Sequence, residues 1–539
     1  MRAVNTTIQN RTKQAKLAST HVLPKHHVDS PDVSAFLVSI AEIEAPKEQI
    51  LFSIGVALLG ASTNPAVHSF LSDVSFEVLE IEGIPHGAFD LLGSCYQYLN
   101  SKAENLAKGS FYTGREIATD FVSDLTFRNG ETILDPACGS GAFLFRSSAP
   151  PEQIVGVDCD PIAIMIAKFN YFIKYPDADK PKLFCDDFFA WYGANGDASF
   201  DYVIGNPPFG ANLDLSLIPS QFVRSGESFS YFIEFSFELL RPGGIMRFLV
   251  PEALLNVKRH TDIRDFLLNY ANVSRIKRYP GKFAGVMSDM YMIEISRGDD
   301  ETVTFEADHL SVMPKALYRQ LKDRVFVQWS DRDLDIVEHV RERGLHDLKS
   351  STFGLGVVTG DNTTKLLSEP APGAEPIYTG KEVERFNLLT PRKFLVFDRK
   401  ALQQVAPDEI YRSTEKLVYK TISKSLKFAR DSSGALTTNS ANILIPSIPG
   451  YDARTVMALL NSPLYSFLYI KLFGGVNKIG KEHLMALPFP ALDPGTQGTI
   501  SALVEEIERG EPTDELDFFI FEQVFGLSRT TLGYISEQI

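Results

Sequence analysis

The stretch Thr132 to Leu144, which reads TILDPACGSGAFL, constrains the fold more than any other part of the sequence. An apolar run ends at Asp135, a small-residue loop with Gly139 and Gly141 follows, and an apolar helix is expected from Ala142. Glycines at alternate positions let a ligand approach the backbone, and free amides at a helix start favour polar or anionic groups. The spacing is not the dinucleotide GxGxxG, and no Lys-Ser/Thr marks a phosphate loop. The stretch predicts a strand, a tight turn and a helix around a bound ligand.

Three further predicted strands end in polar residues in the same way. They are Ile154 to Val157 before Asp158, Lys182 to Phe184 before Asp186-Asp187-Phe188, and Asp201 to Ile204 before Gly205-Asn206-Pro207-Pro208-Phe209. In an open parallel sheet, the carboxyl ends of the strands form the edge where ligands bind. An acidic residue at the end of the second strand typically binds ribose hydroxyls, which we expect of Asp158. The sequence therefore predicts an α/β fold with its ligand at this edge.

The motifs DPACGSG and NPPF, in this order and at this distance, resemble the S-adenosylmethionine-dependent adenine-N6 DNA methyltransferases of the gamma arrangement. In that arrangement the cofactor motif precedes the catalytic motif, and a target-recognition domain follows both. The resemblance covers residues 90 to 490. It implies a Rossmann-like class I methyltransferase sheet and S-adenosylmethionine as the cofactor. It also implies double-stranded DNA as the partner, with a separate restriction endonuclease as a further candidate.

The resemblance also implies which residues form the site. The cofactor-binding residues would be Tyr112, Thr113, Asp135, Ala137, Gly139, Gly141, Asp158, Asp187 and Phe188, and the catalytic residues would be Asn206, Pro207, Pro208 and Phe209. Either Asp186 or Asp187 would meet the cofactor adenine, and the neighbouring Phe188 and Trp191 favour Asp187. Gly114 stands where the family usually has proline, which loosens that turn. A helix cap is an additional role open to Thr113.

The chemistry of adenine N6 explains why such residues are needed. The amine is a poor nucleophile because its lone pair is delocalised into the ring. The side-chain oxygen of Asn206 and the carbonyl oxygen of Pro207 are the expected acceptors for the amino hydrogens. Phe209 and Phe283 would stack on a base that has rotated out of the duplex. Asn at position 206 favours adenine, since cytosine-N4 enzymes more often carry Ser there.

Charge alone argues against a nucleic-acid partner, because the net charge is −15. Residues 345 to 440 differ, with 14 Lys and Arg against 11 Asp and Glu. Basic residues gather in two runs: Arg412, Lys416, Lys420, Lys424, Lys427 and Arg430, and Arg275, Lys277, Arg278 and Lys282. We predict that Lys420 and Lys424 contact DNA. The alternative for the first run is a solvated helix face.

The chain is long enough for several domains. We expect a polar tail at 1–30, a helical region at 31–108, the methyltransferase domain at 109–300, a connecting segment at 301–344, a mixed α+β target-recognition domain at 345–490 and a helical segment at 491–539. No convincing nuclease signature precedes the cofactor motif.

Four cysteines, Cys95, Cys138, Cys159 and Cys185, lack CxxC spacing and a neighbouring His cluster, so we expect no metal site and no disulfide framework. The last three would be buried thiols beside the cofactor motifs, in a reducing cytoplasm. The apolar stretch Leu51 to Ala61 is too short to span a bilayer, so we expect no membrane association.

Two other functions stay open at the level of sequence. A protein-glutamine or RNA N-methyltransferase uses the same chemistry, because Asn-Pro-Pro-aromatic also serves a glutamine amide. Such enzymes usually lack a long C-terminal recognition region. A non-catalytic DNA-specificity subunit would keep the fold alone, and the intact Asn206 to Phe209 argues against it.

Overall fold

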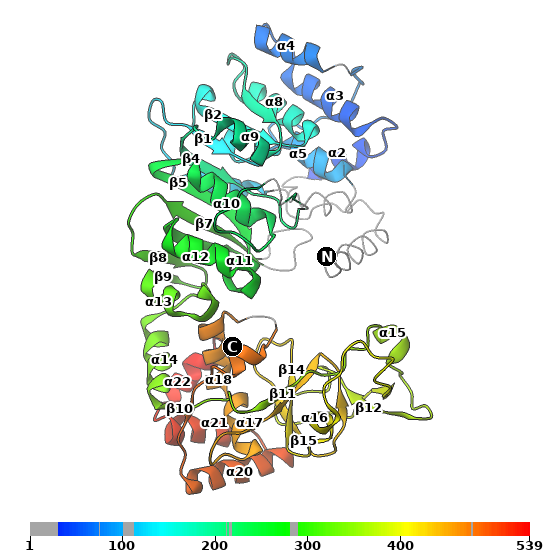
Figure 1. Cartoon of the computed structure of the whole chain (residues 1–539). Coiled ribbons are helices and arrows are strands. Elements are labelled where there is room, and N and C mark those ends of the chain that lie inside the picture. Colours follow the sequence, from blue (N-terminus) through cyan, green and yellow to red (C-terminus); the bar gives the residue numbers. More distant parts are fainter. Residues whose placement is uncertain are drawn as a thin grey trace. The chain divides into compact units, whose positions relative to one another are not determined.

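The computed structural model describes residues 31–74, 76–100, 113–211, 213–214, 218–280, 289–475 and 478–539. The chain divides into two compact units, unit 1 from Met1 to Gln320 and unit 2 from Leu321 to Ile539 (Figure 1). The tail predicted at 1–30 lies outside the described residues.

Unit 1 is built on a nine-stranded sheet with the strand order β3-β2-β1-β4-β5-β7-β6-β8-β9. The strands are β1 (Ile133–Asp135), β2 (Ile154–Asp158), β3 (Lys182–Cys185), β4 (Phe200–Gly205), β5 (Leu240–Pro251), β6 (Val273–Tyr279), β7 (Met290–Ser296), β8 (Thr302–Glu306) and β9 (Leu310–Pro314). The first five in this order are parallel, and β7 runs antiparallel to both β5 and β6. Because β1 pairs with β2 on one side and β4 on the other, the strand order reverses at β1, where such sheets bind ligands.

Helices cover this sheet and the N-terminal region is helical, as expected. They are α2 (Pro31–Ile40), α3 (Lys47–Leu59), α4 (Pro65–Asp73), α5 (Leu91–Leu99), α7 (Arg115–Val122), α8 (Pro161–Lys174), α9 (Phe188–Asn195), α10 (Ser228–Glu238), α11 (Ala253–Asn256), α12 (Thr261–Asn269) and α13 (Lys315–Gln320). The Phe52 and Phe169 rings pack edge to face with centroids 5.7 Å apart, which joins α3 to α8. A side chain at Gly55 would lie 2.6 Å from the Phe169 ring, so this close approach needs glycine. The N-terminal helices therefore share one core with the sheet.

Residues 301–320, expected within a connecting segment, extend the sheet of unit 1 instead. β8 pairs with β6 in parallel, and β9 pairs with β8 antiparallel. Within β9, Ser311 and Met313 are buried while Leu310 and Val312 are exposed, which is the alternation of a strand with one covered face. Five residues are too short a window for that alternation to stand out in the sequence.

The α-helix expected from Ala142 does not form. The chain makes a turn and a single 3-10 turn at Leu144–Arg146. Pro150 and Pro151 lie four and five residues after Arg146, and proline lacks the amide hydrogen that a longer helix would need. The loop at 136–141 is therefore held by contacts other than an α-helix start.

The cysteines are free, but only two are buried. Cys138 is buried as expected, whereas Cys159 and Cys185 are exposed. The prediction of buried thiols was wrong for these two, because both lie at the open carboxyl edge of the sheet, at the ends of β2 and β3.

Unit 2 contains small sheets and a group of helices. The sheet orders are β11-β17-β14-β15, β13-β12-β16 and β10-β18. Its strands are β10 (Gly344–His346), β11 (Thr352–Gly354), β12 (Ala374–Tyr378), β13 (Lys393–Val396), β14 (Lys416–Lys420), β15 (Phe428–Asp431), β16 (Leu436–Thr437), β17 (Ala441–Ile445) and β18 (Phe489–Pro490). Its helices are α14 (Asp331–Arg343), α15 (Asn362–Lys365), α16 (Asp408–Arg412), α17 (Ala453–Asn461), α18 (Pro463–Phe473), α19 (Lys481–Leu484), α20 (Pro494–Glu508), α21 (Asp514–Phe519) and α22 (Arg529–Ser536). Among the described residues, no single helix is long and apolar enough to cross a membrane. Only the pair α17 and α18, which is bent by 66°, reaches the length and apolar composition of a membrane span when the two helices are taken together.

Candidate active site

A cavity of about 530 Å³ lies at the carboxyl edge of the unit 1 sheet. Its walls come from the loops after β1, β2, β3 and β4 and from α5. Of the predicted site residues, the lining includes Thr113, Ala137, Gly139, Asp158, Asp187, Phe188, Asn206 and Pro208. Four others, namely Asp135, Gly141, Pro207 and Phe209, are not among its lining residues. Tyr112 and Phe283 lie outside the described residues. The volume is in the range of small-molecule cofactor sites.

The glycine loop after β1 is fixed to β2. The amide of Gly139 donates to Asp158 Oδ2 at 2.8 Å, and the amide of Cys138 donates to Val157 O at 2.9 Å. Gly139 has φ 54°, and a side chain there would meet nothing within 4 Å, so its position faces open space. Gly141 has φ 82° and packs so tightly on Phe145 that a side chain would overlap the ring. Gly139 therefore leaves space for a ligand on the cavity side of the loop, whereas Gly141 lets the loop pack closely on Phe145.

Asp135 supports this loop without lining the cavity. Its side chain is 1% exposed, and Oδ1 accepts from the amide of Ala137 at 3.0 Å. A side chain at Gly205 would lie 2.8 Å from the same oxygen, so Asp135 also lies against the end of β4. Burial raises the pKa of Asp135 well above its usual range. Among the described residues nothing donates a hydrogen bond to its buried Oδ2 atom.

The carboxylates after β2 and β3 are also fixed by backbone amides. Asp158 Oδ1 accepts from the amide of Asp160 at 2.9 Å. Asp187 Oδ1 caps α9 by accepting from the amides of Phe189 and Ala190. Asp186 lines the cavity beside Asp187, so the two remain alternatives. Phe188 stacks on Phe232 with ring centroids 4.9 Å apart, which fixes its ring in the wall.

The charge of the lining indicates the kind of ligand. Four carboxylates, Asp158, Asp160, Asp186 and Asp187, face the cavity, and none of the described lining residues is Lys or Arg. Carboxylates repel phosphate but attract cations and accept from hydroxyl groups. These residues therefore fit a cofactor with a positive charge and ribose hydroxyls. S-adenosylmethionine has both, whereas a dinucleotide has a pyrophosphate.

Asn206 follows β4 and lies beside the segment that leads into α7. Its Nδ2 group donates to Thr113 Oγ1 at 3.2 Å. Oδ1 is then the atom of this amide that can accept an amino hydrogen. The helix-cap role for Thr113 was wrong, because Gly114 is the N-cap of α7 and has no side-chain cap. Thr113 instead orients Asn206.

The loop that carries Asn206 is held by the start of α10. The hydroxyl of Ser228 donates to Pro208 O and accepts from the amide of Ala211 at 3.3 Å. The amide of Gly210 donates to Glu227 Oε1 at 2.5 Å. Phe209 packs edge to face on Phe229, with ring centroids 6.1 Å apart. The loop after β4 is thus fixed at the backbone of Pro208, Gly210 and Ala211.

One wall of the cavity was missed at the level of sequence. It is formed by α5, through Gly93, Tyr96, Gln97 and Asn100. At its start, the carboxylate of the half-buried Asp90 accepts from the Ser140 hydroxyl and from Asn170 Nδ2 at 2.9 Å. Burial raises the pKa of Asp90 to about 6. Nothing in the sequence around α5 marks these contacts, which depend on where the helix packs.

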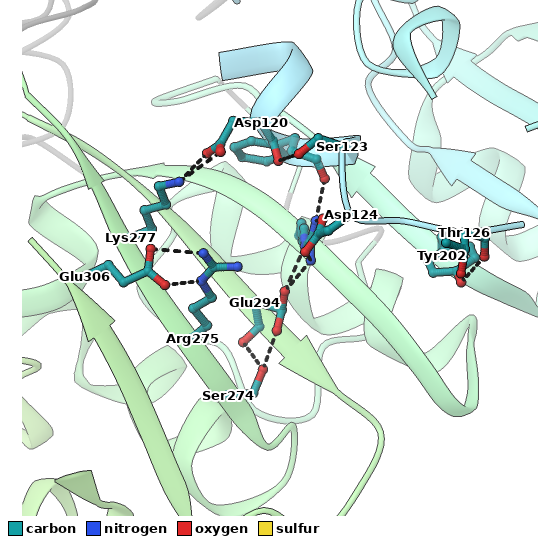
Figure 2. A network of polar contacts seen from close by, with 12 residues as sticks. Asp120, Ser123, Asp124, Thr126, Tyr202, Ser274, Arg275, Lys277, Glu294 and Glu306 are labelled. Atoms are coloured by element: carbon teal, nitrogen blue, oxygen red, sulfur yellow. Dashed lines mark hydrogen bonds and ion pairs between the residues drawn. The ribbon is translucent and has the colours of Figure 1, made fainter. Parts of the chain in front are cut away.

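The basic run of β6 is compensated inside unit 1. Figure 2 shows Lys277 directed at Asp120 and Arg275 at Glu306, with closest distances of 2.7 Å each. Arg278 pairs with Asp308 at 3.0 Å and lies 3.5 Å from Asp289. Lys282 lies outside the described residues.

The basic run of unit 2 is compensated at four of its six positions. The ion pairs are Arg412 with Glu375, Lys416 with Asp431, Lys427 with Glu384 and Arg430 with Glu508. Lys420 and Lys424 have no ion-pair partner within the described ranges. The alternative of a helix face was wrong for most of the run, because 416–420 and 428–431 are paired strands.

Family comparisons agree with the order of these sites. Residues 87–317 match the N-6 DNA Methylase model, and residues 375–489 match the TaqI-like C-terminal specificity domain. Type II methyltransferase M.VspI from Vibrio sp. (strain 343) is 27% identical over 334 residues, which cover 59% of this chain and 80% of the relative. The Type I restriction enzyme MjaIX methylase subunit of Methanocaldococcus jannaschii is 34% identical over 152 residues, 26% of this chain and 25% of the relative.

Solved structures support the fold across both units. The Type IIL restriction-modification enzyme MmeI, solved in complex with DNA, has a TM-score of 0.58 at 10% identity. The match covers 98% of this chain and 94% of that chain. DrdV, also solved with DNA, has a TM-score of 0.55 at 12% identity, over 93% of this chain and 70% of that chain. Both family matches lie in the predicted order, and together they show an adenine-specific DNA methyltransferase with a TaqI-like C-terminal specificity domain.

Proposed function

We propose that the chain transfers a methyl group from S-adenosylmethionine to N6 of an adenine in double-stranded DNA, at a site selected by unit 2. The observation that carries the proposal is that Asn206 and Pro208 line the same cavity as Gly139, Asp158 and Asp187. A side chain that can accept a hydrogen bond from the adenine amino group thus lines the same cavity as the residues that would bind the cofactor.

On the cofactor side, the carboxylate of Asp158 accepts from ribose hydroxyls. Phe188 covers the adenine ring, and Asp187 or Asp186 accepts from its amino group. The backbone at Gly139 lets the cofactor approach the loop closely. S-adenosylmethionine supplies a methyl group that is already activated on a sulfonium, so the contribution of the protein is mainly positioning.

On the substrate side, Asn206 Oδ1 and the Pro207 carbonyl accept the two amino hydrogens of adenine. These hydrogen bonds draw the nitrogen toward tetrahedral geometry and localise its lone pair toward the methyl group. Thr113 keeps the Asn206 amide in the accepting orientation. Preorganised acceptors of this kind act without reorganisation when the reaction occurs.

The amino group of a paired adenine is out of reach of such a cavity. The nucleotide therefore rotates out of the stack, at a cost of about a few kcal/mol. The Phe209 ring, held on Phe229, offers a face for the extruded base. Phe283 remains the candidate for the second face.

DNA is favoured over the alternatives by the specificity domain. A protein-glutamine or RNA N-methyltransferase has no use for a TaqI-like specificity domain, which residues 375–489 match. The Methanocaldococcus jannaschii relative is the methylase subunit of a restriction enzyme, so a separate endonuclease is a candidate partner. The proposal includes a cytoplasmic location, where the chain and such an endonuclease would both have access to DNA.

Product analysis tests the proposal. The purified chain is incubated with methyl-labelled S-adenosylmethionine and duplex genomic DNA from a methylation-deficient host, and the DNA is digested to nucleosides. We expect the label in N6-methyladenine. N4-methylcytosine as the sole product, or label that enters only RNA or protein, would overturn the proposal.

A further inference from the structure

Four segments of unit 2 that are far apart in the sequence meet where β14 ends. The amide of Thr421 donates to Ser440 O at 3.0 Å, and the Thr421 hydroxyl donates to Asn439 O at 3.3 Å. The amide of Gly380 donates to Ser440 Oγ at 3.0 Å. The amide of Ile479 donates to Thr421 O at 2.7 Å. We call residues 379–381, 420–425, 439–440 and 478–479 the loop cluster.

The loop cluster presents side chains from a fixed backbone. Thr421 and Leu426 are each 1% exposed, and the amide of Leu426 donates to Ser466 Oγ at 3.1 Å. Between these anchors, Ile422 is 63% exposed. Asn439 is also exposed, although its backbone is held by Thr421 and by Val357 O. A single exposed apolar residue is normal on a protein surface, but Ile422 lies on segments that also carry exposed lysines.

The loop cluster carries four lysines: Lys381, Lys420, Lys424 and Lys478. All are exposed except Lys420, which is half-buried. No carboxylate pairs with any of the four in the part of the chain that the structure describes. Two acidic residues near Lys381 in the sequence have other partners. Glu382 is buried and accepts from Thr379, and Glu384 pairs with Lys427. In a chain of net charge −15, this is a local concentration of uncompensated positive charge.

We propose that the loop cluster is the surface with which unit 2 reads DNA, an inference that rests on the proposed function. The four lysines bind phosphates, which fixes position but carries no sequence information. Ile422 and Asn439 contact base edges. Asparagine can bond both N6 and N7 of adenine in the major groove, and an aliphatic side chain can contact the thymine methyl group.

The phosphate contacts are tested with Lys381→Ala together with Lys478→Ala. Each lost phosphate contact makes the slope of log affinity against log salt concentration less negative by about 0.9. Duplex affinity at low salt should fall on the order of tenfold or more, because two phosphate contacts are lost. The matched control combines Lys349→Ala and Lys400→Ala, two exposed lysines of unit 2 outside the cluster. Equal affinity and equal salt slope in test and control variants would overturn the assignment.

The base contacts are tested with Ile422→Ala and Asn439→Ala, by sequencing the sites that each variant methylates. We expect a relaxed or altered recognition sequence, with cofactor affinity unchanged. Leu345→Ala, which removes an apolar side chain that is 73% exposed elsewhere in unit 2, is the control and should keep the wild-type sequence. Wild-type recognition in both test variants contradicts the inference. That result leaves the proposed function standing if the wild type forms N6-methyladenine, whereas a wild type that forms none defeats the function itself.

Discussion

The cavity edge of unit 1 and the loop cluster of unit 2 are each a place where four segments meet, but the segments meet for different reasons. In unit 1, β1 to β4 are parallel, so the loops after them reach the same edge by topology. In unit 2 the strands are mixed, and the four segments are joined by individual hydrogen bonds around Thr421 and Ser440. A motif after a parallel strand can be placed from the sequence, whereas the loop cluster cannot.

Charge shows the same contrast. Asp158, Asp186 and Asp187, which follow two of the predicted strands, line the cavity. The cations of 412–430 look alike in the sequence, yet Lys416 is fully buried on Asp431 while Lys424 is exposed. Local composition therefore indicates that unit 2 is rich in basic residues. Only the packing shows which of them are exposed and can bind DNA.

The largest expected effect separates these two kinds of lysine. Lys416→Met leaves Asp431 buried without its cation, which typically costs about 3–5 kcal/mol. Lys424→Met alters an exposed side chain and should change stability by less than about 0.5 kcal/mol. Denaturant unfolding, followed by a probe in unit 2, measures both. Equal stability of the two variants would break the distinction between structural and DNA-facing lysines.

A smaller effect is expected at the catalytic loop. Ser228→Ala removes the donor to Pro208 O, and the loss of one such hydrogen bond, about 0.5–1.5 kcal/mol, should lower kcat roughly twofold to tenfold. The affinity for S-adenosylmethionine should not change. Ser230→Ala is the matched control, because this buried hydroxyl on the same helix has no hydrogen-bond partner in the described structure. If the two variants have the same kcat, Ser228 does not position the loop.

What could be predicted from the sequence follows from this contrast. The positions of Asp158, Asp187 and Asn206 at or just after the ends of β2, β3 and β4 were predictable, because apolar runs mark the strands and the motifs follow them in a known order. The α5 wall and Asp90 were not, because a helix packed from a distant segment leaves no local pattern. The helix expected from Ala142 is reduced to a single 3-10 turn at Leu144–Arg146, which the apolar run does not reveal.

The central claim is that unit 1 holds the cofactor and Asn206 activates the amine as separate tasks within one cavity. Cofactor titration and single-turnover methyl transfer to duplex DNA, measured on one preparation of Asn206→Ala, test it most directly. We predict cofactor affinity close to that of the wild type and a loss on the order of a hundredfold or more in transfer rate, by analogy with the removal of other preorganised hydrogen-bond partners. Near-wild-type transfer, or a loss of transfer explained entirely by lost cofactor binding, would contradict the claim.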